Sequence, residues 1–134
     1  MSGGSKIDPD RHADRTALAF NEAIATRDVA ALSRLMTEDH TFIDSDKNVV
    51  RGKEDVLDAW RGFFVTFADY HNVWTEVFAS GDTVIAVGHS VCAAEPELDG
   101  PAIWSATVRD NQVRTWRVYE DTPENRALLG LGIG

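Results

Sequence analysis

The sequence is poor in cysteine and in long apolar runs. Cys92 is the only cysteine among 134 residues, so no disulfide can form within one chain, which suits a reducing compartment. No apolar run is long enough to cross a bilayer, and the N-terminal residues lack the apolar stretch of a signal peptide. We therefore expect a cytoplasmic protein with no membrane partner.

Basic residues are also scarce. The chain has 13 Lys and Arg against 22 Asp and Glu, a formal net charge of −9 with His neutral. A surface that binds nucleic acid is normally basic, because it must neutralise phosphates. Compact metal-ligand spacings and glycine-rich phosphate loops are absent from the sequence. The expected partners therefore include no nucleic acid, and we expect no metal and no cofactor.

Helical periodicity is found mainly in the first half of the chain. Residues 1–7 are small and polar, and we expect them to be flexible, whereas residues 8–134 are long enough to form one domain. Asp8 and Asp28 are predicted to act as helix N-caps. Apolar residues at helical spacing predict three helices, over residues 8–26, 28–36 and 53–67.

The remaining segments have the pattern of strands. A short hairpin is predicted within residues 40–51, and four long strands follow the third helix as a meander, joined by "SGDT", "EPELDG" and "DN". Thr122–Pro123 begins a short terminal helix. Segregated helices and strands are typical of an α+β fold with helices packed on one face of a mostly antiparallel sheet. The concave side of such a curled sheet is a natural pocket.

Four segments resemble the SnoaL-like branch of the superfamily that includes nuclear transport factor, ketosteroid isomerase and the polyketide cyclases. They are "AIATRDVAALSRLMTEDHTFID", "VRGKEDVLDAW", "SGDTVIAVG" and "VRDNQVRTWRVYEDT", and the likeness covers about residues 12–129. The resemblance implies a cone-shaped half-barrel with three main helices on a strongly curved mixed sheet, a deep apolar pocket, and a homodimer through the outer sheet surface. It implies no single reaction, because this fold carries isomerases, cyclases, hydrolases, dehydratases and non-catalytic proteins.

Asp44 is the main candidate for a catalytic residue. By resemblance, it matches the aspartate that acts as general base in ketosteroid isomerases. On a strand, Phe42 and Asp44 share one face, so both point into the pocket if either does. Burial would then strengthen this carboxylate as a base towards a carbon next to a carbonyl. The alternative is an aspartate that ends the strand and hydrogen-bonds the "SDK" turn.

Two positions depart from the ketosteroid isomerase pattern. Phe20 occupies the place of the tyrosine that donates to the oxyanion, and Trp104 stands at about the place of the protonated aspartate. An enolate would lack its main stabilisation without these donors, so ketosteroid isomerisation is not expected. His89 is the candidate acid–base partner, because histidine titrates near neutral pH; a histidine satisfied within the core is the alternative.

The other candidates would form an apolar binding surface. The predicted substrate-binding residues are Phe20, Phe42, Trp60, Phe64, Trp104, Trp116 and Glu120. Two functions fit this pattern. One is a cofactor-free isomerase, cyclase, dehydratase or hydrolase that acts on a hydrophobic small molecule with Asp44 as base. The other is a non-catalytic binding or dimerisation module whose cone is filled by its own aromatic side chains.

Overall fold

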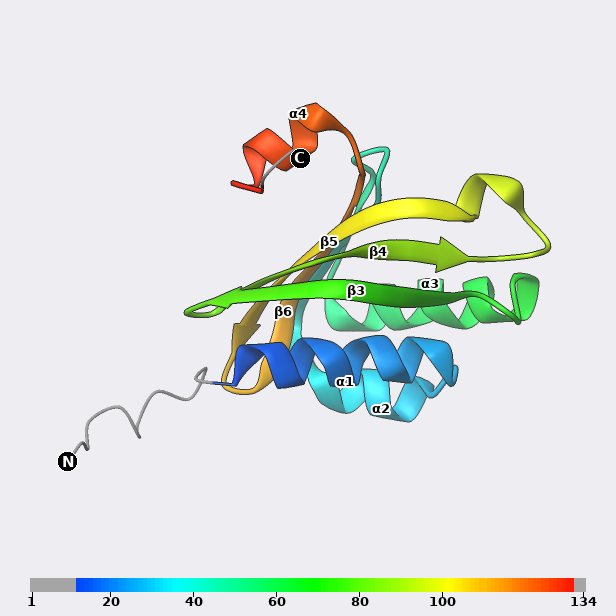
Figure 1. The fold of residues 1–134 in the computed structure, drawn as a ribbon. Helices are drawn as coiled ribbons and strands as arrows, with labels where there is room; N and C mark the ends of the chain where they lie inside the picture. The colour runs from blue at the N-terminus through cyan, green and yellow to red at the C-terminus, as the bar shows by residue number, and fades with distance from the viewer. Residues whose placement is uncertain (1–11, 132–134) are drawn as a thin grey trace.

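The computed structural model describes residues 12–131 and has helices on both sides of a curved sheet (Figure 1). The helices are α1 (Ala13–Ala25), α2 (Val29–Leu35), α3 (Lys53–Thr66) and α4 (Pro123–Leu128), with a short 3₁₀ helix, η2, at Pro96–Leu98. The strands are β1 (Met36–Ile43), β2 (Val49–Arg51), β3 (His71–Ser80), β4 (Thr83–Val91), β5 (Gly100–Arg109) and β6 (Gln112–Glu120). The predicted flexible residues 1–7 and the predicted cap at Asp8 lie outside the described residues.

The strands form one mixed sheet in the order β2-β1-β6-β5-β4-β3. Strand β1 pairs with β6 in parallel, and every other neighbouring pair is antiparallel. Helices α1, α2 and α3 lie against one face of the sheet, and α4 lies on the other side (Figure 1). The α+β half-barrel predicted from the sequence is therefore confirmed, including the four-strand meander β3 to β6.

Local chemistry explains where several helices begin. The carboxylate of Asp28 accepts a hydrogen bond from the Ala31 N–H at 3.0 Å, which satisfies a free donor at the start of α2. The hydroxyl of Thr122 does the same for the Asn125 N–H at 3.1 Å, and Pro123 follows it as the first residue of α4. Gly52 precedes α3 with a φ of 93°, a conformation that favours glycine.

The main core lies between the three helices and the inner face of the sheet. Trp74, Trp104 and Trp116 come from three different strands and all pack in this core, with Trp74 ring centroids 5.9 Å from Trp104 and 5.7 Å from Trp116. Fully burying one large apolar side chain stabilises the fold by roughly 1.5–3 kcal/mol. Most of the aromatic surface on the strands is therefore used inside the cone and not on its outer face.

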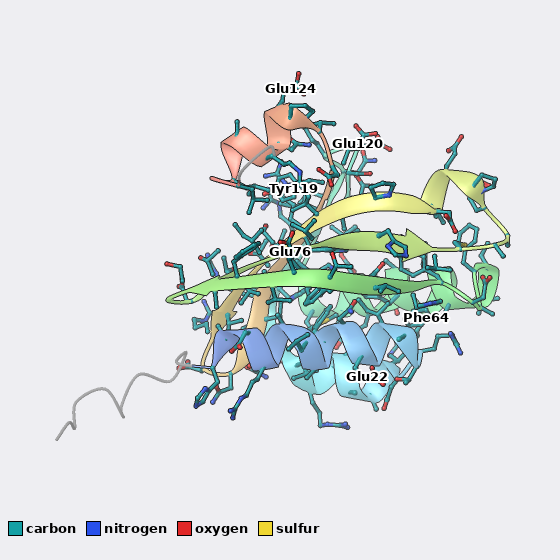
Figure 2. All side chains as sticks on the ribbon, in the orientation of Figure 1. Glu22, Phe64, Glu76, Tyr119, Glu120 and Glu124 are labelled. Atoms are coloured by element: carbon teal, nitrogen blue, oxygen red, sulfur yellow. The ribbon has the colours of Figure 1, made fainter. Side chains whose placement is uncertain are left out.

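A second, smaller cluster lies on the outer face. Val87, Ile103 and Tyr119 pack there with Leu129 and Leu131 from the end of the chain. Tyr119 lies beneath α4 (Figure 2). The strands β4, β5 and β6 therefore bury apolar residues on both faces, so apolar alternation alone does not distinguish the inner face from the outer one.

Candidate functional site

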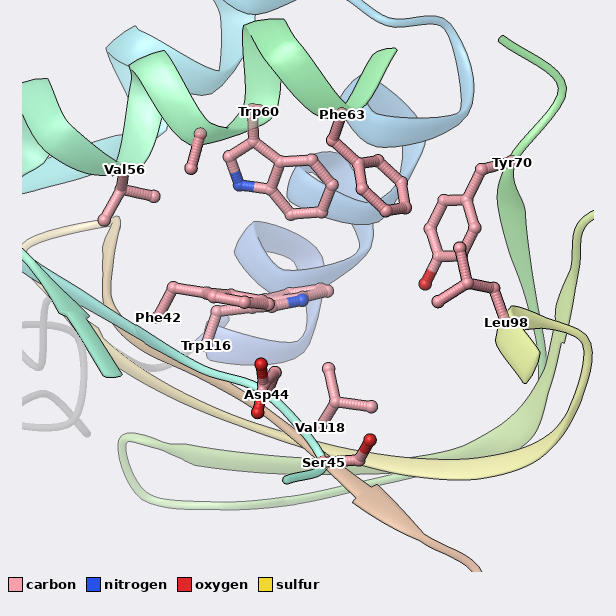
Figure 3. Close-up of a pocket in the computed structure, with 11 residues that line it drawn as sticks. Phe42, Asp44, Ser45, Val56, Trp60, Phe63, Tyr70, Leu98, Trp116 and Val118 are labelled. Atoms are coloured by element: carbon pink, nitrogen blue, oxygen red, sulfur yellow. The ribbon is translucent and has the colours of Figure 1, made fainter. Parts of the chain in front are cut away.

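A cavity of about 250 Å³ lies between α3 and the inner face of the sheet (Figure 3). Its walls are mainly aromatic and aliphatic, and three residues, Asp44, Ser45 and Tyr70, bring hydroxyl or carboxyl groups. The lining residues are Phe42, Asp44, Ser45, Val56, Ala59, Trp60, Phe63, Tyr70, Leu98, Trp116 and Val118. A concave, mostly apolar site with a few polar groups is the usual form of a small-molecule site.

Helix α3 supplies the aromatic wall because of its residue spacing. Val56, Trp60 and Phe63 recur on one side of the helix and face the cavity. The Trp60 ring packs edge-on against Phe42 of β1 at 5.7 Å and against Phe63 at 5.6 Å, measured between ring centroids. The Phe63 ring in turn lies 4.8 Å from that of Tyr70, again edge-on. These contacts fix the shape of the wall.

Asp44 lies both at the cavity wall and in the turn, the two placements that the sequence left open. It lines the cavity together with Phe42, as their shared strand face predicts. Its carboxylate also closes the following turn: Oδ1 accepts from the backbone N–H groups of Asp46 and Asn48, each at 2.9 Å. Among residues 12–131, Oδ2 accepts only from the Asn48 side-chain amide, at 3.1 Å. The turn therefore holds the carboxylate at the cavity wall.

Three of the predicted binding residues belong to the core and do not line the cavity. Phe20 is fully buried and packs against Trp116, with ring centroids 4.5 Å apart, so it lies behind the cavity wall. Trp104 is 1% exposed, and its indole nitrogen has no hydrogen-bond partner among the described residues. Phe64 stacks on Trp60 at 5.3 Å. These rings support the site from outside it.

His89 and Glu120 do not line the cavity with Asp44. His89 is exposed on β4 and pairs in register with Val73 and Pro101, on the face opposite the buried Ser90. The sheet therefore separates this imidazole from the cavity, and the structure does not bring it together with Asp44. Glu120 is exposed at the end of β6 and lines a second, outer hollow.

That second hollow forms a polar vestibule next to the apolar cavity. It has a volume of about 420 Å³, and four residues line both spaces: Ser45, Tyr70, Leu98 and Val118. The vestibule also carries the carboxylates of Glu97, Asp99, Glu120 and Asp121. Asp121 is paired with Arg126 at 2.6 Å, and this guanidinium lowers the pKa of the Asp121 carboxyl group. The vestibule is therefore acidic.

Tyr70 is a further functional candidate that was not among the site residues predicted from the sequence. Its ring is 8% exposed and lies between the cavity and the vestibule, and its hydroxyl end points into the cavity (Figure 3). The hydroxyl lies 3.3 Å from the Ser90 hydroxyl. Burial raises the pKa of Tyr70 above its usual value, although side-chain hydrogen bonding with Ser90 and Asn72 opposes this. Tyr70 therefore keeps its proton at neutral pH.

The chain belongs to the SnoaL-like domain family. The family model matches residues 17–118, which span α1 to most of β6 and include Asp44, Tyr70 and the aromatic wall. No curated protein is significantly similar to the chain in sequence. Within residues 12–131, no helix is both long enough and apolar enough to cross a membrane. The same residues contain no group of three or more His, Cys, Asp or Glu side chains suited to a metal ion.

Solved structures share the fold at low sequence identity. An NTF2-like protein of unknown function from Cytophaga hutchinsonii is 17% identical, with a TM-score of 0.68 over 87% of this chain and 94% of that one. An LEH-like epoxide hydrolase from M. tuberculosis is 18% identical, with a TM-score of 0.70 over 81% and 82%. A hypothetical protein with a ketosteroid isomerase-like fold from Catenulispora acidiphila, in complex with trimethylamine, is 20% identical, with a TM-score of 0.66 over 87% and 93%.

Proposed function

We propose that this protein binds a hydrophobic small molecule in the cavity and acts on it without a cofactor, with Asp44 as general base. The main support is the position of the Asp44 carboxylate on the wall of an otherwise mostly apolar cavity. A ligand bound in the cavity would have its reacting atom held next to this carboxylate. The reaction class would be that of an isomerase, cyclase, lyase or hydrolase.

The hydrogen bonds of Asp44 are compatible with this role. Three N–H donors from the turn bind the carboxylate and fix its orientation. Oδ2 accepts only one of them, and a carboxylate oxygen has two acceptor sites. One acceptor site of Oδ2 is therefore left for a proton of the ligand.

Two of the structural neighbours support the choice of a small molecule as ligand. One is described as an epoxide hydrolase and another as a complex with trimethylamine. Both share only the fold with this chain, so they support a site in the same type of cone and not a particular substrate. The inner aromatic wall of Trp60, Phe63 and Trp116 favours a ligand with a flat, apolar body.

A probe substrate whose reaction needs only one general base, called here the single-base probe, tests the role of Asp44. In 5-nitrobenzisoxazole, removal of the ring C–H proton turns the C–H electron pair into a nitrile, breaks the N–O bond and releases a coloured phenolate. We expect saturable turnover by the wild type. Asp44→Asn should lower the rate by roughly 10²-fold or more, the usual contribution of a positioned base. Asp46→Asn, in the same turn but outside the cavity lining, is the matched control and should leave the rate unchanged.

A non-catalytic binding role is the second candidate function. The observation that favours it is the bonding of Asp44 to its own turn, which is a sufficient structural reason for an aspartate there. One experimental result distinguishes the two candidate functions. If wild type and Asp44→Asn convert the probe equally slowly while a ligand still binds in the cavity, binding without catalysis is the function.

We also propose that the protein forms a homodimer through the outer sheet face. Val73 and Phe78 of β3 are 38% and 47% exposed, and their register partners on β4 place both on this face. They adjoin the cluster under α4 that contains Val87 and Tyr119. Exposed apolar side chains next to a covered apolar cluster are typical of an association surface.

A further inference from the structure

Four side chains connect α1, the neighbouring strands β3 and β4, and the cavity through one series of hydrogen bonds. The amide nitrogen of Asn21 lies 3.3 Å from the backbone oxygen of Asn72, and the Asn72 amide nitrogen lies 3.1 Å from Asn21 Oδ1. The Ser90 hydroxyl lies 3.0 Å from Asn72 Oδ1 and 3.3 Å from the Tyr70 hydroxyl. Asn72 and Ser90 are 7% and 6% exposed, so solvent offers them few other partners.

The backbone carbonyl at one end fixes the direction of every bond in this chain. A carbonyl oxygen only accepts, so Asn21 must turn its NH₂ group towards Asn72 and present its own oxygen to the Asn72 side chain. Asn72 must then donate to Asn21, which leaves the Asn72 side-chain oxygen facing Ser90. Ser90 has one proton and gives it to that oxygen. The Ser90 oxygen can therefore only accept from Tyr70.

The Tyr70 hydroxyl thus donates its proton away from the cavity and offers the cavity a lone pair. This is the opposite of an oxyanion donor, which would have to point its O–H at the ligand. Asp44, on another part of the wall, is also an acceptor. The N–H donors on the wall are the indole groups of Trp60 and Trp116, which come from α3 and β6 (Figure 3).

We propose that the Tyr70 end of the cavity binds the hydrogen-bond donor of an otherwise apolar ligand, and that a protonated amine is preferred over a hydroxyl group there. A carbonyl group is disfavoured at this position because it would face a second lone pair. The preference for a charged amine comes from the vestibule, which Tyr70 also lines and which carries the carboxylates of Glu97, Asp99 and Glu120. This inference rests on the proposed small-molecule role of the cavity but not on Asp44 as a base.

Three probes with one carbon skeleton test it: 1-aminoindane, 1-indanol and 1-indanone. Their dissociation constants can be measured by NMR titration, with the indole N–H signals of Trp60 and Trp116 reporting binding in the cavity. One neutral hydrogen bond corresponds to roughly fivefold to tenfold in affinity. We therefore expect 1-indanol to bind about fivefold to tenfold more tightly than 1-indanone. We expect 1-aminoindane to bind most tightly, and its advantage in affinity should decrease as salt is added.

Two variants assign the preference to Tyr70. Tyr70→Phe removes the acceptor and should reduce the advantage of 1-indanol over 1-indanone to less than about twofold. Ser90→Ala removes the group that holds the Tyr70 proton, so the hydroxyl can turn and donate; 1-indanone should then bind several-fold more tightly than to the wild type. Ser105→Ala is the matched control, because its hydroxyl lies 3.3 Å from the Tyr119 hydroxyl on the outer face. It should change none of the three constants.

The outcomes separate the inference from the proposed function. Failure of all three probes to bind would reject both the small-molecule role and the inference. Binding with 1-indanone equal to or tighter than 1-indanol would reject the inference and leave the cavity as a binding site. A preference for the donors that survives in Tyr70→Phe would also overturn it, since the preference would then come from another group. Circular dichroism of each variant checks that the fold is intact.

Discussion

Gly88 is the position at which one added methyl group should perturb the fold most. It lies on β4 opposite Trp74, where β3 and β4 come unusually close beside a β-bulge. A Cβ atom at this position would overlap the carbonyl oxygen of Val73 and would lie 2.9 Å from the Cα of Trp74. Both contacts are with backbone, which cannot rotate away as a side chain can. Gly88→Ala therefore requires β3 to move away from β4.

The expected loss follows from this geometry. Overpacking a filled core typically destabilises by 1–3 kcal/mol, and a clash with hydrogen-bonded backbone belongs at the upper end. We therefore expect Gly88→Ala to lower the free energy of unfolding by about 3 kcal/mol and the melting temperature by roughly 10 °C. The movement would also separate Asn72 from Ser90, whose side chains flank this point, so the discrimination between indanol and indanone should weaken.

Urea denaturation followed by tryptophan fluorescence measures the free energy of unfolding. Gly62→Ala is the matched control, because Gly62 lies in the exposed part of α3 and an added Cβ meets nothing within 4 Å. The same substitution there should stabilise the protein by roughly 0.5–1 kcal/mol, since alanine favours the helix. A Gly88→Ala protein as stable as the wild type would refute the claim that the strands approach too closely for a side chain.

Three further predictions concern charge and association. Burial lowers the pKa of His40, so below pH 6.5 the unfolded chain binds a proton that the folded chain does not. As the pH is lowered below 6.5, the free energy of unfolding should therefore decrease more steeply in the wild type than in His40→Gln. Asp121→Asn removes the ion pair with Arg126 and should loosen α4 by about 1 kcal/mol, measured as faster amide exchange there. If the proposed dimer forms, Phe78→Asp should sediment as a monomer at micromolar concentration, where the wild type sediments as a dimer; a wild type that is already monomeric would reject the proposed interface.

The parts of the fold that the sequence predicted are those that depend on local chemistry. The cap at Asp28, the helix start at Thr122–Pro123 and the helix predicted over residues 53–67 follow from near neighbours in the chain, and all three are found. His89 shows the limit of this reasoning. Its strand is apolar on both faces, because Leu129 and Leu131 return to cover the outer one. No pattern within β4 could therefore show that His89 faces away from the cavity.

The depth of a side chain within the cone is a second property that the periodicity of apolar residues does not predict. Phe20 and Trp116 both face inwards, but only Trp116 reaches the cavity, because Phe20 packs behind it. Tyr70 precedes β3 directly, and its direction depends on Phe63 of α3 and on Ser90 of β4, which is 20 residues away in the sequence. The site residues that were missed are those whose orientation is set by tertiary contacts.

The two roles of Asp44, turn and cavity, can be separated by two substitutions at the same position. Asparagine keeps a side-chain oxygen that can accept from the Asp46 and Asn48 N–H groups, whereas alanine removes both bonds. Because these groups are in an exposed turn, where water replaces lost partners, we expect Asp44→Ala to lower the free energy of unfolding by about 1 kcal/mol and Asp44→Asn by less than half of that. Activity towards the single-base probe should be lost equally in both. An Asp44→Asn protein that is as destabilised as Asp44→Ala would show that the charge, and not the turn geometry, is what this aspartate contributes to the fold.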